Sequence, residues 1–202
     1  TEEIPGGEYQ PKFIASKAHI LIVDDVPINL KVMQGLLKKT KICVDVAESG
    51  IQCLDMVKEK QYDMIFMDHM MPKMDGIETF CRLKAENVDI LSHTPVIMLT
   101  ANAIVGVKEK YLEEGFTDYL SKPVKSEQLE EILLKYLPKN LLEEYTEEET
   151  ESVTDTTDQE DFLENIFFLN TDQSMLFCGG NIDFYKEILQ MFAQNDKTEL
   201  IR

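Results

Sequence analysis

The hydrophobic positions of the first 138 residues follow two alternating patterns. Short continuous apolar runs predict buried strands, and the stretches between them repeat apolar residues every three or four positions, as amphipathic helices do. The predicted strands are 19–23, 42–47, 64–67, 95–99 and 116–120. The predicted helices are 27–37, 50–60, 77–91, 104–114 and 126–136. Strand and helix therefore alternate five times along this part of the chain.

This alternation predicts an α/β fold class. Connections between parallel strands are right-handed crossovers, so successive strand–helix units build a parallel sheet with helices on both faces. We therefore expect one domain over residues 18–138, with a five-stranded parallel sheet.

The segments on either side of this domain lack the pattern. Residues 1–17 contain Gly and Pro and little periodicity, which predicts a linker. Residues 139–165 are rich in Glu, Asp and Thr and predict an acidic linker. An amphipathic pattern returns in 166–202, where we expect a short all-α segment that must pack on something else, because one such helix has no core of its own.

Charge and cysteine usage narrow the function classes. The chain has 38 acidic and 20 basic residues and a formal net charge of −18, which argues against nucleic-acid binding and against direct contact with anionic membrane. The four cysteines are far apart, with no Cys-x-x-Cys, as in proteins of a reducing compartment. We expect a cytoplasmic location, which is compatible with a membrane-anchored parent protein.

Polar residues follow four of the predicted strands. Asp24 and Asp25 follow the first strand, Asp68 the third, Thr100 the fourth, and Lys122 comes shortly after the fifth. Because parallel strands present their carboxyl ends at one edge of a sheet, we expect these side chains to meet.

Such a group predicts phosphoryl-transfer chemistry. Three neighbouring carboxylates repel each other unless a cation compensates, and Mg²⁺ prefers oxygen ligands. A carboxylate beside Mg²⁺ can attack a phosphoryl group in line, while Lys122 and Thr100 hold phosphoryl oxygens. The product on Asp68 would be an aspartyl phosphate.

These residues and their order resemble the receiver domain of bacterial two-component signalling, the response-regulator type. The resemblance covers the first 138 residues and rests on Asp24-Asp25, Asp68 with Met-Pro and Asp-Gly after it, Thr100-Ala101 and Lys122-Pro123. It implies a flavodoxin-like (βα)5 receiver fold. It also implies that Asp68 is the phosphoacceptor, and that the domain catalyses its own aspartyl phosphorylation and dephosphorylation with a phosphohistidine as donor.

The resemblance implies further site residues. Asp25 would bind Mg²⁺ directly and Asp24 directly or through water, with Asp68 and the backbone carbonyl of Met70 completing the protein ligands.

The resemblance also implies a conformational switch and a cis peptide bond. Thr100 and Tyr119 match the family's switch pair, in which the hydroxyl moves toward the phosphoryl group and the aromatic ring turns inward. The Lys122–Pro123 peptide bond is expected to be cis. His69, directly after the acceptor, is unusual for the family.

The C-terminal segment suggests the wider context. Residues 175–192 resemble the opening of a histidine phosphotransfer domain, but no histidine follows His93, so the relay histidine is absent. We expect the receiver of a hybrid sensor histidine kinase, cut within a following phosphotransfer domain. An unrelated amphipathic docking helix is the alternative for this segment.

The expected partners follow from this context. They are a kinase dimerisation domain and a histidine phosphotransfer domain. A dimer is possible through the C-terminal helix or through the face formed by 104–114, 116–120 and 126–136.

Other classes fit the sequence less well. A phosphorylation-independent interaction module that regulates a kinase is the main alternative. A haloacid dehalogenase-type phosphatase would need Asp-x-Asp after the first strand, where this chain has Asp24-Asp25-Val26. No basic recognition helix or Gly-rich phosphate loop supports a DNA-binding regulator or a flavodoxin cofactor site.

Overall fold

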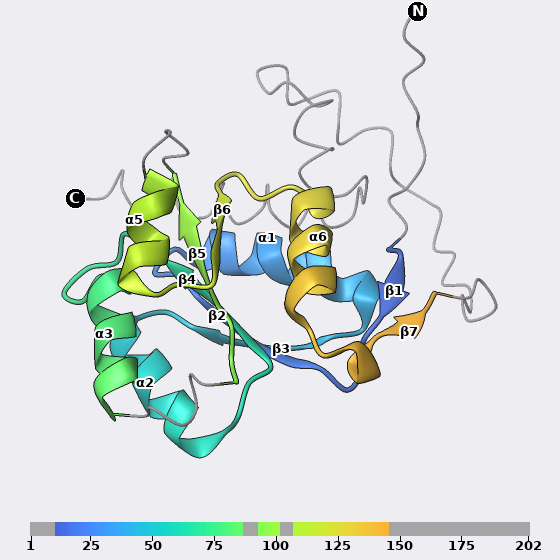
Figure 1. Cartoon of the computed structure of the whole chain (residues 1–202), viewed down its shortest axis with the longest axis horizontal. Coiled ribbons are helices and arrows are strands. Elements are labelled where there is room, and N and C mark those ends of the chain that lie inside the picture. Colours follow the sequence, from blue (N-terminus) through green and yellow to red (C-terminus); the bar gives the residue numbers. More distant parts are fainter. Residues whose placement is uncertain (1–10, 87–92, 102–106, 146–202) are drawn as a thin grey trace, which may run out of the picture.

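The computed structural model describes residues 11–86, 93–101 and 107–145 and contains a central parallel sheet (Figure 1). Its five strands lie in the order β3-β2-β4-β5-β6, and every neighbouring pair is parallel. The strands are β2 (His19–Val23), β3 (Cys43–Ala47), β4 (Met64–Asp68), β5 (Val96–Thr100) and β6 (Asp118–Ser121). The predicted fold class is confirmed.

Helices cover both faces of this sheet. They are α1 (Pro27–Leu37), α2 (Gly50–Glu59), α3 (Gly76–Glu86), α5 (Val107–Glu114) and α6 (Ser126–Tyr136). Helices α1 and α6 pack on one face, and α2, α3 and α5 pack on the other (Figure 1). Successive residues of β2 alternate between the two cores, with Ile20 and Ile22 in one and Leu21 and Val23 in the other. Burial on both faces explains why the sequence shows continuous apolar runs.

The domain extends beyond both predicted boundaries. Strand β1 (Phe13–Ile14) pairs antiparallel with β7 (Glu143–Glu144), on the side of the domain near α6 (Figure 1). Phe13 is buried in the core, and Lys12 pairs with the buried Glu130 of α6. Residues 11–17 and 139–145 are therefore not linker, contrary to the prediction, because a two-residue strand shows no periodicity in a sequence.

Some predictions concern residues outside the described part of the chain. Residues 166–202, the phosphotransfer-like segment, lie there, as do 87–91 at the end of the third predicted helix and 104–106 at the start of the fourth. Among the described residues, the structure has no helix with the length and apolar character of a membrane span. Two short 3₁₀ helices, η1 (Lys38–Thr40) and η2 (Lys139–Leu141), complete the described elements.

Candidate functional site

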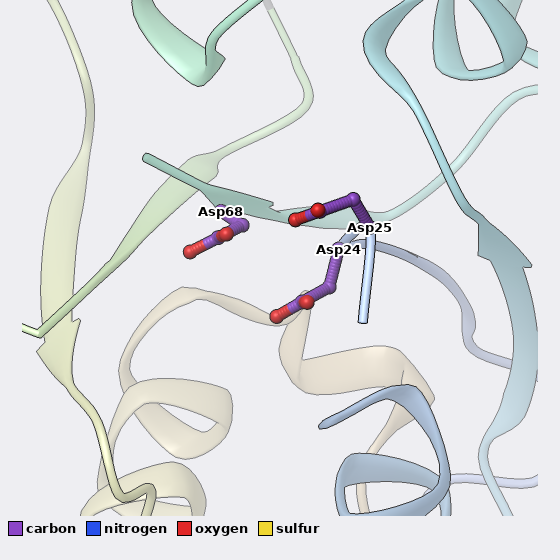
Figure 2. A group of neighbouring side chains, drawn as sticks. All are labelled: Asp24, Asp25 and Asp68. Atoms are coloured by element: carbon purple, nitrogen blue, oxygen red, sulfur yellow. The ribbon is translucent and has the colours of Figure 1, made fainter. Parts of the chain in front are cut away.

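Three carboxylates meet at the carboxyl edge of the sheet. Asp24 and Asp25 directly follow β2, and Asp68 is the last residue of the adjacent strand β4. One oxygen from each carboxylate lies within 4.8 Å of the others, and Figure 2 shows the three side chains next to one another. The structure thus brings together the three residues that the sequence predicted to meet.

Asp24 is held rigidly by its neighbours. Its Oδ1 accepts hydrogen bonds from the backbone N–H of Val26, at 2.9 Å, and from Asn29 Nδ2, at 3.0 Å. Its Oδ2 accepts from Asn29 at 3.1 Å and from Lys122 Nζ at 2.5 Å. Both oxygens of this buried carboxylate therefore already have donors. Asn29, on the first turn of α1, was not among the predicted site residues, because its contact with Asp24, five positions earlier, depends on how the chain turns from β2 into α1.

Lys122 joins two of the carboxylates. Its Nζ lies 2.5 Å from Asp24 Oδ2 and 2.6 Å from Asp68 Oδ1. The backbone N–H of Lys122 donates to the carbonyl of Thr100 at 2.8 Å, and the Lys122–Pro123 bond is cis, in agreement with the family expectation. The position of Lys122 next to β5 thus directs its ammonium to the end of β4.

The site carries an excess of negative charge. Three carboxylates face one ammonium, so two negative charges remain uncompensated among these four groups. Burial raises the pKa of Asp68, the hydrogen bond and charge of Lys122 lower it, and Asp24 and Asp25 raise it, with a net upward shift. The ionised form of the Asp68 carboxyl is therefore disfavoured unless a further cation is present.

The loop after Asp68 returns tightly to the strand end. The backbone N–H of Gly76 donates to the carbonyl of His69 at 3.0 Å. A Cβ on Gly76 would overlap the backbone oxygen of Asp68, so only glycine fits there. Within this loop Met71 and Met74 are buried, whereas Met70 is 71% exposed.

Thr100 ends β5 and is 1% exposed. Its Oγ1 accepts a hydrogen bond from Tyr111 Oη at 3.2 Å, and Tyr111 Oη lies 3.3 Å from His69 Nδ1. The sequence identified His69 as unusual and assigned no role to Tyr111.

Tyr119, the predicted switch aromatic, lies on β6, is half-buried and packs against the core shared with Tyr111.

Comparisons with known proteins agree with this geometry. The model of the family described as response regulator receiver domain matches residues 20–134. The histidine-protein kinase BarA of Escherichia coli is 42% identical over 119 residues, covering 59% of this chain and 13% of that protein. Hybrid signal transduction histidine kinase I of Dictyostelium discoideum is 33% identical over 147 residues, covering 68% of this chain and 8% of that protein.

Solved structures give the same result. The receiver domain of a sensor histidine kinase from Pseudomonas aeruginosa PAO1, described with a magnesium ion coordinated in its active site cleft, is 34% identical and has a TM-score of 0.53. The match covers 59% of this chain and 96% of that domain. The chemotaxis protein CheY4 of Vibrio cholerae is 29% identical with a TM-score of 0.54, covering 59% of this chain and 98% of that one.

The family match thus spans more than half of the chain, and it encloses the strand-end carboxylates and the lysine described above. The relatives BarA and kinase I, of which this chain spans about a tenth, are both named as histidine kinases. This chain belongs to the response regulator receiver domain family, and its acidic cluster is of the kind that forms the family's phosphoacceptor site.

Proposed function

We propose that Asp68 accepts a phosphoryl group from a phosphohistidine. The observation that carries this proposal is the position of Asp68 at a buried strand end, with Lys122 Nζ 2.6 Å from Oδ1 and two more carboxylates beside it. An Asp68 oxygen would form the new O–P bond while the P–N bond of the donor breaks. The electron pair of that bond returns to the imidazole nitrogen, so no other reactant is needed.

The neighbouring side chains have distinct roles in this step. The Lys122 ammonium would shift from pairing two carboxylates to holding a phosphoryl oxygen, where it offsets charge in the transition state. The Thr100 hydroxyl would donate to another phosphoryl oxygen, and Tyr119 would follow its movement. The Lys122 backbone N–H is hydrogen-bonded to the Thr100 carbonyl, so the Lys122 ammonium and the Thr100 hydroxyl would approach the phosphoryl group from neighbouring positions at the sheet edge.

The residues present fit Mg²⁺. They offer carboxylate oxygens with two uncompensated charges, the donor set that this ion prefers. Asp25, Asp68 and the Met70 carbonyl would hold it directly, and Asp24 through water, because both Asp24 oxygens already accept hydrogen bonds. When bound, Mg²⁺ neutralises charge on the phosphoryl oxygens.

The partners follow from the relatives. BarA and hybrid kinase I of Dictyostelium are named as histidine kinases. We therefore propose a hybrid histidine kinase as the parent protein. A kinase dimerisation domain would be the phosphoryl donor, and a histidine phosphotransfer domain would be the onward acceptor. Residues 166–202 resemble the opening of such a phosphotransfer domain. A cytoplasmic location suits these partners and the exposed free thiols of Cys43 and Cys81.

The test is the intact mass of the protein after incubation with Mg²⁺ and acetyl phosphate. We expect one phosphoryl adduct that EDTA prevents and that is lost in Asp68→Asn. Asp63→Asn is the matched control, because Asp63 precedes the same strand at its opposite end and accepts a hydrogen bond from the His19 backbone. Labelling of Asp68→Asn would refute the assignment, and a protein with neither adduct nor Mg²⁺ binding would support the phosphorylation-independent interaction module.

A further inference from the structure

A short hydrogen-bonded chain connects the loop after Asp68 to Thr100 through helix α5. His69 Nδ1 lies 3.3 Å from Tyr111 Oη, and Tyr111 Oη donates to Thr100 Oγ1 at 3.2 Å. A phenolic oxygen has one hydrogen, so when Tyr111 donates to Thr100 it must accept from His69. This order requires the proton of the neutral imidazole to be on Nδ1.

Tyr111 is held in place by packing. It is 2% exposed, and its ring meets that of Phe116 edge to face at 6.2 Å. Phe116 stacks on Phe80 of α3 at 4.1 Å, and the Phe116 N–H donates to the Tyr111 carbonyl at 3.0 Å. The Tyr111 hydroxyl therefore has little freedom to follow a moving partner.

His69 is held equally well from the other side. Its backbone N–H donates to the carbonyl of Leu99, the residue before Thr100, at 3.0 Å. Its ring meets the Tyr111 ring edge to face at 5.6 Å. The two residues thus form a fixed frame around the end of β5, where the Thr100 hydroxyl lies.

We propose that Tyr111 is a positioning residue that, with His69, holds the Thr100 hydroxyl in its place before phosphorylation and opposes its movement toward the phosphoryl group. At 3.2 Å the Tyr111–Thr100 bond is already longer than most O–H···O bonds, so a displaced Thr100 breaks it. This bond stabilises only the unphosphorylated arrangement, and it shifts the equilibrium between the two arrangements. The inference rests on the proposed function, because Thr100 has this role only if Asp68 carries a phosphoryl group.

The substitution that tests the inference is Tyr111→Phe, which removes the hydroxyl and keeps the packed ring. Beryllofluoride serves as the probe, because it mimics a phosphoryl group on a carboxylate and its bound fraction can be measured by ¹⁹F NMR at fixed Mg²⁺. We expect Tyr111→Phe to bind it about twofold to fivefold more tightly than the wild type, the effect of losing one weak hydrogen bond from the unliganded state.

Tyr62→Phe is the matched control. Tyr62 is also buried in the core that contains Tyr111, and its hydroxyl donates to Asp45 Oδ2 at 2.9 Å, away from the site. We expect its affinity for beryllofluoride to equal that of the wild type. An unchanged or weaker affinity in Tyr111→Phe, with the wild type binding normally, would overturn the inference and leave the proposed function intact. No binding by the wild type would overturn the proposed function as well.

A second measurement examines the frame itself. The chain has three histidines, so long-range ¹H–¹⁵N spectra of the imidazoles are simple, and His69→Leu identifies the His69 signal. In mildly alkaline buffer we expect His69 to be protonated on Nδ1 in the wild type, with a different tautomer balance in Tyr111→Phe. An unprotonated Nδ1 in the wild type would overturn the inference. Because His69 is only partly buried, His69→Leu should fold, and it should also tighten beryllofluoride binding.

Discussion

Replacing Asp68, the proposed phosphoacceptor, should make the metal-free domain more stable. In Asp68→Asn the shape of the side chain is kept and its charge is removed. Each neighbouring carboxylate lies within 4.8 Å, which corresponds to a repulsion of about 3.5 kcal/mol or more at an effective dielectric constant of about 20. The attraction of Lys122 at 2.6 Å is about 6 kcal/mol on the same scale.

These opposing interactions nearly cancel, so burial decides whether the Asp68 charge raises or lowers the free energy of unfolding. Two repulsions slightly exceed one attraction, and burial, the largest influence on Asp68, also opposes the charged form. We therefore expect Asp68→Asn to raise the free energy of unfolding in EDTA at neutral pH by at least about 1 kcal/mol. This corresponds to a rise in Tm of about 3–5 °C for a domain of this size.

The assay is urea unfolding followed by circular dichroism, with and without Mg²⁺. Mg²⁺ should stabilise the wild type, because it binds the folded state, and it should stabilise Asp68→Asn much less. The pKa of Asp68 is raised in the folded protein, so its charge destabilises the fold above that pKa, and the destabilisation disappears as the pH falls through it. The difference between the two proteins should therefore shrink in acid. A variant less stable than the wild type in EDTA would refute this reasoning.

Three further predictions concern other parts of the domain. Gly76→Ala forces a Cβ onto the Asp68 backbone oxygen, so we expect a loss of about 1–3 kcal/mol in unfolding experiments and weaker Mg²⁺ binding by calorimetry; wild-type values would contradict the close approach. Burial raises the pKa of Cys53 to about 12, so iodoacetamide should modify the exposed Cys43 in the folded protein and Cys53 only after unfolding, as peptide mass mapping would show. Phe13→Ala should cost about 3 kcal/mol in urea unfolding, because Phe13 is 3% exposed, and a neutral result would mean that residues 11–17 add nothing to the core.

The sequence by itself determined the fold and most of the acidic site. Strands buried on both faces must be continuously apolar, and parallel strands joined by helices must present their carboxyl ends at one edge. For this reason Asp24, Asp25 and Asp68 could be placed together from their positions after strands, and Lys122 could be placed beside them.

Only the tertiary structure decided which side chains complete the site and where the domain ends. Tyr111 meets His69 across 42 positions of sequence, and Lys12 meets Glu130 across 118. The hydrophobic periodicity of a sequence does not predict such pairs, because they depend on how α5 and α6 pack against the sheet. A tyrosine at a helical core position looks in a sequence like any other buried aromatic, and its hydroxyl gains a partner only when the helix is in place.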